Sequence, residues 1–329
     1  MAKPVVYVTC QVVGDCVKRL QSNFEVRYRD NPLPGTYDEL LAQGRDADAL
    51  ICVLDDTVDA KLMQSSPRLR VVANVAVGFD NIDIAEATKR GILVTNTPGV
   101  LTDATADLAF ALLLSVSRRV TESDRYVRAG NWKGWSTDFM LGHSVQGKTL
   151  GIIGMGRIGE GVAKRAEAFG MKTVFTRRGN GEKDARLYNQ LGAKRVTMEE
   201  LLDKSDFISL HCPLNSETRH LIGEAQFSQM KPNCIFINTA RGAVVDQRAL
   251  IYALQSRQIA GAGLDVFENE PDVPPELIDM PNVTLLPHIG SATIETRAAM
   301  SDMAADAVIS VFDGAVPPNN VNGASLSHA

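Results

Sequence analysis

Short apolar runs alternate with amphipathic stretches through the first hundred residues. Stretches of five or six residues rich in β-branched and aromatic side chains lie at 4–9, 24–28, 48–52, 70–75 and 92–96. Segments with helical spacing of apolar residues lie between them, at 37–44, 59–66 and 83–91. Strands that alternate with helices predict a parallel sheet covered by helices.

A second alternating series begins at Thr149. Its predicted strands cover residues 149–153, 172–176, 206–210, 234–238, 259–266 and 283–287. One intervening helix should begin at Thr197 with a capping box, in which the Glu200 side chain reaches back to the Thr197 backbone; another should begin near Asp246. We therefore expect an α/β fold with two doubly wound parallel-sheet domains and a cleft between them.

A long amphipathic segment, residues 101–129, connects the two series. It is longer than an average helix, so we expect it to connect two bodies or to pack on a partner chain. Residues 130–147 have no clear periodicity and are predicted to form a surface excursion. The aromatic side chains of Trp132 and Trp135 on it would have to be buried against another surface. A symmetric homodimer is the commonest solution. The helical tail, residues 293–313, should cross back to the first domain.

Composition narrows the class of protein. The 329 residues are 45% hydrophobic and 22% charged, as in an ordinary globular protein. The net charge of −5 argues against a nucleic-acid partner. Five cysteines without a CxxC pair favour a reducing cytoplasm. No signal peptide is evident, and the most apolar long segment, 104–116, is too short to span a bilayer. We expect a cytoplasmic protein without a membrane partner.

The motif 154-GMGRIG-159 lies between a predicted strand and a predicted helix. In such a loop Gly154 allows a tight turn, Gly156 lets the backbone approach a pyrophosphate, and Gly159 lets the helix pack on the strand. The pyrophosphate then meets the helix N-terminus. A glycine-rich turn with no ligand is the alternative.

Arg177 and Arg178 stand where an NAD site usually places a ribose-binding carboxylate. Guanidinium groups favour a 2′-phosphate instead, so the sequence predicts NADP(H) as cofactor. The alternative is a solvated basic turn.

Three residues with chemistry of their own follow predicted strands of the second series: Arg241, Glu270 and His288. Each lies within a longer motif, at 236–246, 262–271 and 287–297 respectively, and further motifs lie at 74–83, 154–159 and 207–218. Through these motifs the chain resembles the D-2-hydroxyacid dehydrogenases, and within that family the glyoxylate/hydroxypyruvate and 2-ketogluconate reductases.

The resemblance implies a role for each of the three residues. His288 would donate a proton to the keto oxygen, and Glu270 beside it would favour the imidazolium. Arg241 would bind the substrate carboxylate and polarise the carbonyl. The structural alternatives are an ion pair for Arg241, a loop carboxylate for Glu270 and a core histidine for His288.

Further site residues follow from the same resemblance. The N–H groups of Val77 and Gly78 would hold the substrate carboxylate, Leu54 would line the pocket, and Trp135 would reach a neighbouring subunit's site. Cofactor contacts beyond the glycines and arginines would come from Arg157, Ile158, Cys212, Thr239, Asp265 and Ser291. No metal is expected. The implied domains are a flavodoxin-like substrate domain, 1–99 with 293–329, and a Rossmann-type cofactor domain, 100–292.

These observations favour an NADPH-dependent reductase of glyoxylate and hydroxypyruvate. A 2-ketogluconate reductase is the near alternative. From another class, a dinucleotide-binding corepressor-like protein would share the fold but serve peptide recruitment. An NAD-linked biosynthetic enzyme such as phosphoglycerate dehydrogenase is disfavoured by Arg177.

Overall fold

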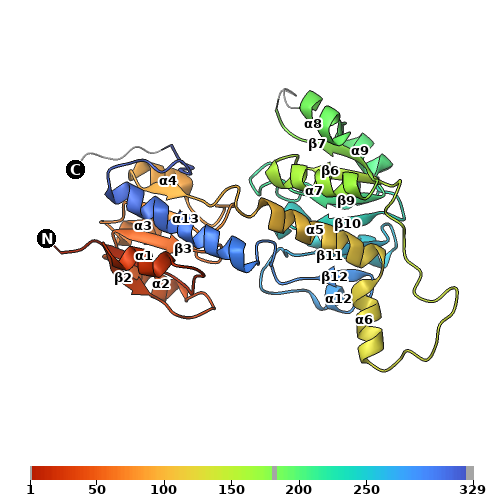
Figure 1. Cartoon of the computed structure of the whole chain (residues 1–329), viewed down its shortest axis with the longest axis horizontal. Helices are drawn as coiled ribbons and strands as arrows, with labels where there is room; N and C mark the ends of the chain where they lie inside the picture. The colour runs from red at the N-terminus through yellow and green to blue at the C-terminus, as the bar shows by residue number, and fades with distance from the viewer. Residues whose placement is uncertain (1, 180–183, 324–329) are drawn as a thin grey trace. The chain divides into compact units, whose positions relative to one another are not determined.

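The computed structural model describes residues 2–179 and 184–323 (Figure 1). The chain forms two compact units. The first comprises the residues up to Leu101 and those from Ser291 on, and the second comprises Thr102–Gly290.

The first unit has a five-stranded parallel sheet in the order β2-β1-β3-β4-β5. Its strands are β1 (Val5–Val8), β2 (Glu25–Tyr28), β3 (Ala49–Cys52), β4 (Val71–Asn74) and β5 (Leu93–Thr95). This is the strand order of flavodoxin-like folds. Four short helices connect the strands: α1 (Cys16–Gln21), α2 (Tyr37–Gly44), α3 (Ala60–Ser65) and α4 (Ile84–Lys89).

The long helix α13 (Ile294–Phe312) belongs to this unit and packs against α1, β3 and β4 (Figure 1). Helices α2, α3 and α4 contribute Leu40, Leu62 and Ala87 to the core on the sheet. Because helices cover both faces, the inner strands β1, β3 and β4 are buried at every position rather than alternating, whereas the edge strand β2 is not.

The second unit has a seven-stranded parallel sheet in the order β12-β11-β10-β9-β6-β7-β8. The strands are β6 (Thr149–Ile153), β7 (Lys172–Thr176), β8 (Lys194–Arg195), β9 (Phe207–Leu210), β10 (Ile235–Asn238), β11 (Gly261–Leu264) and β12 (Val283–Leu285). Strand order reverses between β6 and β9, which is the switch point where doubly wound sheets bind ligands.

Helices surround this second sheet. They are α5 (Thr102–Ser117), α6 (Val120–Arg128), α7 (Arg157–Ala168), α8 (Asp184–Leu191), α9 (Met198–Lys204), α10 (Glu224–Phe227), α11 (Gln247–Gln255) and α12 (Pro275–Ile278), with a 3₁₀ turn at Gly242–Val244. Helix α5 packs on β10, β11 and α7. Two parallel-sheet units therefore confirm the predicted fold class.

The prediction of one continuous segment over residues 101–129 is wrong, because the helix breaks between α5 and α6. Arg119 has a φ of 55°, in the left-handed region. The carbonyl of Ser117, which a continuing helix would use, accepts the His143 N–H at 2.7 Å instead. Gly142 makes this approach possible, since a Cβ there would lie 2.3 Å from that same oxygen. Helix α6 consequently leaves the body of the unit and buries none of its residues.

The capping box at Thr197 is only half present. The Thr197 hydroxyl accepts the Glu200 N–H at 3.2 Å, so the predicted start of α9 is correct. The Glu200 carboxylate pairs with Lys204 one turn later instead of reaching back. An i,i+4 ion pair competes here for the same side chain.

Within the described ranges 2–179 and 184–323, no helix is long and apolar enough to cross a membrane. All five cysteines are free thiols, and four of them are buried.

Candidate active site

Polar, charged and glycine residues that could bind a ligand or take part in catalysis follow the carboxyl ends of six adjacent strands in the second unit. In sheet order from β12 to β7 they are His288, then Asp265 and Glu270, then Thr239 and Arg241, then Cys212, then the glycine loop, then Arg177 and Arg178. Because the carboxyl ends of parallel strands share one edge of the sheet, these residues lie in a row along that edge. Such an edge suits an extended ligand.

His288 and Glu270 form the tightest pair on this edge. The His288 Nδ1 and Glu270 Oε2 atoms are 2.7 Å apart, and each side chain is 23% exposed. The other carboxylate oxygen accepts the Phe267 N–H at 2.9 Å. Burial acts to raise the pKa of Glu270, but these bonds and the charges of His288 and Arg241 lower it below its usual value. Glu270 is thus a carboxylate that holds the His288 ring through Nδ1.

The backbone at His288 is unusual, with a φ of 54° in a residue other than glycine. Asp265 stabilises it twice. The Asp265 carbonyl accepts the His288 N–H at 2.9 Å, and its Oδ1 accepts the Ile289 N–H at 2.7 Å. Strained backbone of this kind costs about 1–3 kcal/mol and clusters at functional sites. Neither hydrogen bond was predicted from the sequence.

Arg241 lies in a loop that two close contacts fix. The buried Asn238 accepts the Ala240 N–H at 3.0 Å and donates to the Arg241 carbonyl at 2.9 Å. Next to it, a Cβ on Gly242 would lie 1.8 Å from the Phe267 carbonyl carbon. The Arg241 loop therefore touches the backbone of the loop that carries Glu270.

Two buried oxygen atoms on this edge have no hydrogen-bond partner within the described part of the chain: Asp265 Oδ2 and Thr239 Oγ1. Burial is the main cause that raises the pKa of Asp265. Orphaned buried acceptors are rare in folded proteins and point to a missing donor. The amide of a nicotinamide ring would supply such a donor to Asp265, which the family resemblance implies lies near it.

The glycine loop has the geometry of a phosphate cradle. Gly154 has a φ of 100°, and a Cβ there would lie 2.6 Å from the Cys212 nitrogen. A Cβ on Gly159 would meet the Gly154 carbonyl at 2.5 Å. Gly156, the N-cap of α7, is exposed, and no side chain caps the helix there. Arg157 and Ile158 begin the helix, so its first N–H groups suit an anion.

The two arginines after β7 have different surroundings. Arg177 is 16% exposed and donates to Asp184 Oδ1 at 2.8 Å, while Arg195 binds the other oxygen of that carboxylate at 3.3 Å. Arg178 is 67% exposed and pairs with Glu217, which is equally open to solvent. Arg178 is thus the guanidinium that can change partners at low cost. The sequence did not show that Arg177 is held in a local ion-pair cluster.

In the first unit, three predicted substrate contacts follow neighbouring strands. Leu54 follows β3, and Val77 and Gly78 follow β4; all three are partly exposed. Ser291, predicted as a cofactor contact, also belongs to this unit, where its carbonyl accepts the Thr293 N–H at 2.9 Å.

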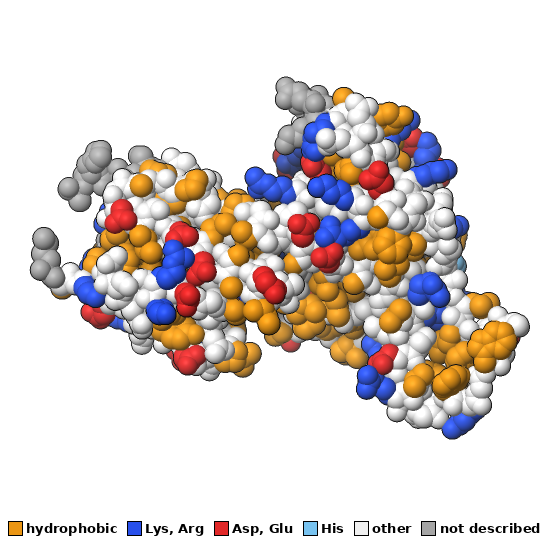
Figure 2. All heavy atoms as spheres, viewed as in Figure 1, with side chains coloured by type: hydrophobic (Ala, Val, Ile, Leu, Met, Phe, Trp, Pro, Cys, Tyr) orange, Lys and Arg blue, Asp and Glu red, His pale blue; other side chains and the backbone are white. Residues whose placement is uncertain are grey.

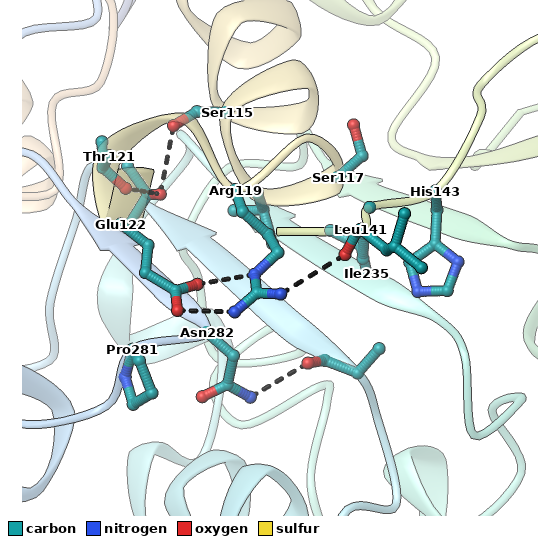
Figure 3. Close-up of a pocket in the computed structure, with 14 residues that line it drawn as sticks. Ser115, Ser117, Arg119, Thr121, Glu122, Leu141, His143, Ile235, Pro281 and Asn282 are labelled. Atoms are coloured by element: carbon teal, nitrogen blue, oxygen red, sulfur yellow. Dashed lines mark hydrogen bonds and ion pairs between the residues drawn. The ribbon is translucent and has the colours of Figure 1, made fainter. Parts of the chain in front are cut away.

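Trp135 lies on the excursion between α6 and β6 and is 79% exposed. The later part of this excursion, at Leu141, Gly142 and His143, lines a cavity of about 220 Å³ at the amino edge of the second sheet (Figure 3). Arg119 binds both oxygens of Glu122 at 2.6 and 2.8 Å and points toward the Leu141 carbonyl. Since Ala260 and Pro281 precede β11 and β12, this cavity lies at the edge opposite the His288–Glu270 pair.

The family described as D-isomer specific 2-hydroxyacid dehydrogenase, NAD binding domain, matches residues 110–290. The chain belongs to this family. It is 51% identical over 327 residues to a glyoxylate reductase of Thermococcus litoralis, covering 97% of each chain. A glyoxylate reductase of Korarchaeum cryptofilum is 50% identical over 326 residues, which are 97% of this chain and 96% of the relative.

Solved structures agree with these sequence relatives. The structure of an NADPH-dependent glyoxylate/hydroxypyruvate reductase from Sinorhizobium meliloti, in complex with NADP and malonate, matches with a TM-score of 0.87 and 34% identity. The match covers 100% of both chains. The protein is therefore an oxidoreductase with a dinucleotide-binding domain, which confirms the predicted family.

Proposed function

We propose that this protein reduces a small 2-keto acid, glyoxylate or hydroxypyruvate, to the 2-hydroxy acid with NADPH, and that His288 donates the proton. The observation that carries the proposal is the 2.7 Å pair of His288 and Glu270 on the carboxyl edge of the sheet. A histidine held by a carboxylate through one ring nitrogen is suited to donate a proton from the other.

Each residue has a defined task in this chemistry. A nicotinamide, when bound, would supply the hydride to the carbonyl carbon. His288 donates the proton on its Nε2 atom to the developing alkoxide. Before this transfer, the negative charge of Glu270 stabilises the protonated imidazolium. Arg241 binds the carboxylate and polarises the keto oxygen with a planar fork of donors. In the first unit, the N–H groups of Val77 and Gly78 bind the substrate carboxylate, and Leu54 lines the pocket.

The glycine loop and the start of α7 are proposed to bind the pyrophosphate, and Asp265, Thr239, Cys212 and Ser291 to line the rest of the cofactor. The exposed guanidinium of Arg178 supports a 2′-phosphate, since it can exchange Glu217 for a dianion. The relative from Sinorhizobium meliloti is itself described as NADPH-dependent.

A homodimer fits the excursion. Large apolar side chains are exposed along α6 and the segment after it: Val120, Val127, Trp132, Trp135, Phe139 and Leu141 (Figure 2). A second copy of the chain would bury this surface, and Trp135 is proposed to reach the partner's substrate site. A cytoplasmic location remains a proposal from the free thiols.

The proposal is tested by kcat/KM for glyoxylate, hydroxypyruvate, 2-ketogluconate and phenylpyruvate, each with NADPH and NADH. Glyoxylate or hydroxypyruvate with NADPH should give the highest values. A maximum for 2-ketogluconate would instead support the 2-ketogluconate reductase. Cofactor binding without turnover of any of the four would favour the corepressor-like alternative, which the intact His288–Glu270 pair disfavours.

A further inference from the structure

The turn that carries Val77 and Gly78 is held from behind by asparagine side chains. Asn96, the first residue after β5, donates its amide to the Val77 carbonyl at 2.8 Å. The next residue, Thr97, donates its backbone N–H to the Ala76 carbonyl at 2.9 Å. Two successive carbonyls of the turn therefore face the end of β5.

This arrangement fixes the direction of two N–H groups. In a planar trans peptide the C=O and the N–H of the next residue point in opposite directions. Because the Ala76 and Val77 carbonyls face β5, the N–H groups of Val77 and Gly78 both point away from it. Adjacent N–H groups that point the same way form a concave anion-binding site.

Asn74 holds the third carbonyl of the turn. Its side-chain amide, fully buried, donates to the Gly78 carbonyl at 2.9 Å and to the Asn81 side chain at 3.1 Å. Asn81 in turn donates to the carbonyls of Val53 and Asp56 at 3.1 and 3.0 Å. The loop that contains Leu54 is thus joined to the same network.

The segment after α13 completes the support. The Asn319 side chain donates to the Asn96 carbonyl at 2.6 Å, and the Asn96 N–H donates to the Asn319 carbonyl at 3.3 Å. Further along, Asn322 accepts the Val94 N–H at 3.2 Å and donates to the Ile92 carbonyl at 2.8 Å. This segment lies along the edge strand β5, and Asn319 contacts Asn96 through both its side chain and its backbone.

We propose that Asn96 and Asn74 are positioning residues that aim the Val77 and Gly78 N–H groups at the substrate carboxylate, and that Asn319 clamps Asn96 from the C-terminal segment. The inference rests on the proposed function, since it concerns the carboxylate-binding half of that site. None of the three asparagines takes part in proton or hydride transfer. Their loss should weaken carboxylate binding in the ground state and the transition state alike, which raises KM and leaves kcat nearly unchanged.

The test compares Asn96→Ala, Asn319→Ala and the control Asn322→Ala in the full-length protein. Asn96→Ala should raise KM for glyoxylate roughly 5–50-fold, as for the loss of one to two oriented hydrogen bonds to a carboxylate, with kcat within about 3-fold of the parent. Asn319→Ala, whose backbone contact persists, should raise KM roughly 2–5-fold. Asn322→Ala loses hydrogen bonds to Val94 and Ile92 of the same edge of the sheet, none of them to the turn, and should leave KM unchanged.

Two further measurements distinguish a loss of substrate positioning from a general loss of structure. The inhibition constant of oxamate, which carries a carboxylate, should rise by the same factor as KM, and the dissociation constant of NADPH should not move. An unchanged KM in Asn96→Ala, or equal losses in kcat and NADPH binding, would overturn the inference. If Asn96→Ala does not fold, an unchanged KM in Asn319→Ala overturns it.

Failure of the proposed function is recognised separately, as a parent protein that reduces neither glyoxylate nor hydroxypyruvate. In that case calorimetry of oxamate with the NADPH-loaded parent and Asn96→Ala decides the inference. Weaker oxamate binding in the variant supports it. Equal binding, or no binding to the parent, overturns it.

Discussion

Arg178 offers the sharpest test of cofactor choice. The side chain is 67% exposed and its ion-pair partner, Glu217, is 65% exposed. Arg178→Ala should remove a charge-assisted contact to a 2′-phosphate, which contributes about 1.5–3 kcal/mol. Exposure to solvent and screening by salt bring this free-energy contribution to the low end of that range, so NADPH affinity should fall roughly 10-fold. NADH lacks the phosphate, and its affinity should stay within about 2-fold of the parent.

Glu217→Gln gives the opposite perturbation at the same place. A carboxylate beside Arg178 competes with the phosphate and repels it. Its neutralisation should strengthen NADPH binding by about 0.5–1 kcal/mol, or roughly 2–5-fold, without effect on NADH. The two variants should therefore move the NADPH/NADH preference in opposite directions.

Arg177→Ala is the matched control. This guanidinium is bonded to Asp184 within a cluster that includes Arg195. Its removal should lower Tm and change the cofactor preference less than Arg178→Ala does. The assay is the dissociation constant of each cofactor by fluorescence titration at low and high salt. A preference that Arg178→Ala leaves unchanged, or a parent that binds NADH more tightly, would refute the phosphate interpretation.

Three further predictions concern the catalytic loops and the excursion. Glu270→Gln removes the carboxylate that stabilises the protonated His288, so the basic limb of the kcat/KM profile should move to lower pH, and an unmoved limb would contradict the pairing. Gly242→Ala places a Cβ 1.8 Å from the Phe267 carbonyl carbon, so it should cost about 1–3 kcal/mol in the free energy of unfolding and lower kcat/KM; denaturation and kinetics equal to the parent's would show that the contact is dispensable. Trp135→Asp should weaken a homodimer by about 2–4 kcal/mol and raise KM for the keto acid, and a parent that is monomeric in light scattering at micromolar concentration would sink the dimer.

Apolar periodicity was sufficient to locate the main strands. Residues 149–153 and 172–176 are apolar runs bounded by turn residues, and β6 and β7 have those bounds. Short elements with little apolar content were not predicted, as with the two-residue β8 and the six-residue α1. Their formation depends on neighbours that are distant in sequence.

The candidate site was predictable where a motif carries its chemistry, as for His288, Glu270 and the glycine loop. It was not predictable where a side chain's partner comes from elsewhere in the chain. Asp184 neutralises Arg177 from the following helix, and the N–H of His143 ends α5 by binding Ser117. The support of Val77 by Asn96 likewise crosses from one strand end to another. Such contacts are set by tertiary structure, which local patterns do not encode.

The most direct test of the account is single-turnover reduction of glyoxylate by NADPH-loaded protein, measured for the parent and His288→Asn. Asparagine keeps a polar side chain near Glu270 but supplies no transferable proton. The account predicts a decrease in the rate of NADPH oxidation of roughly 10²–10⁴-fold, as expected for the loss of a general acid, with the NADPH dissociation constant unchanged. A rate within a few-fold of the parent would contradict the assignment of His288 as proton donor.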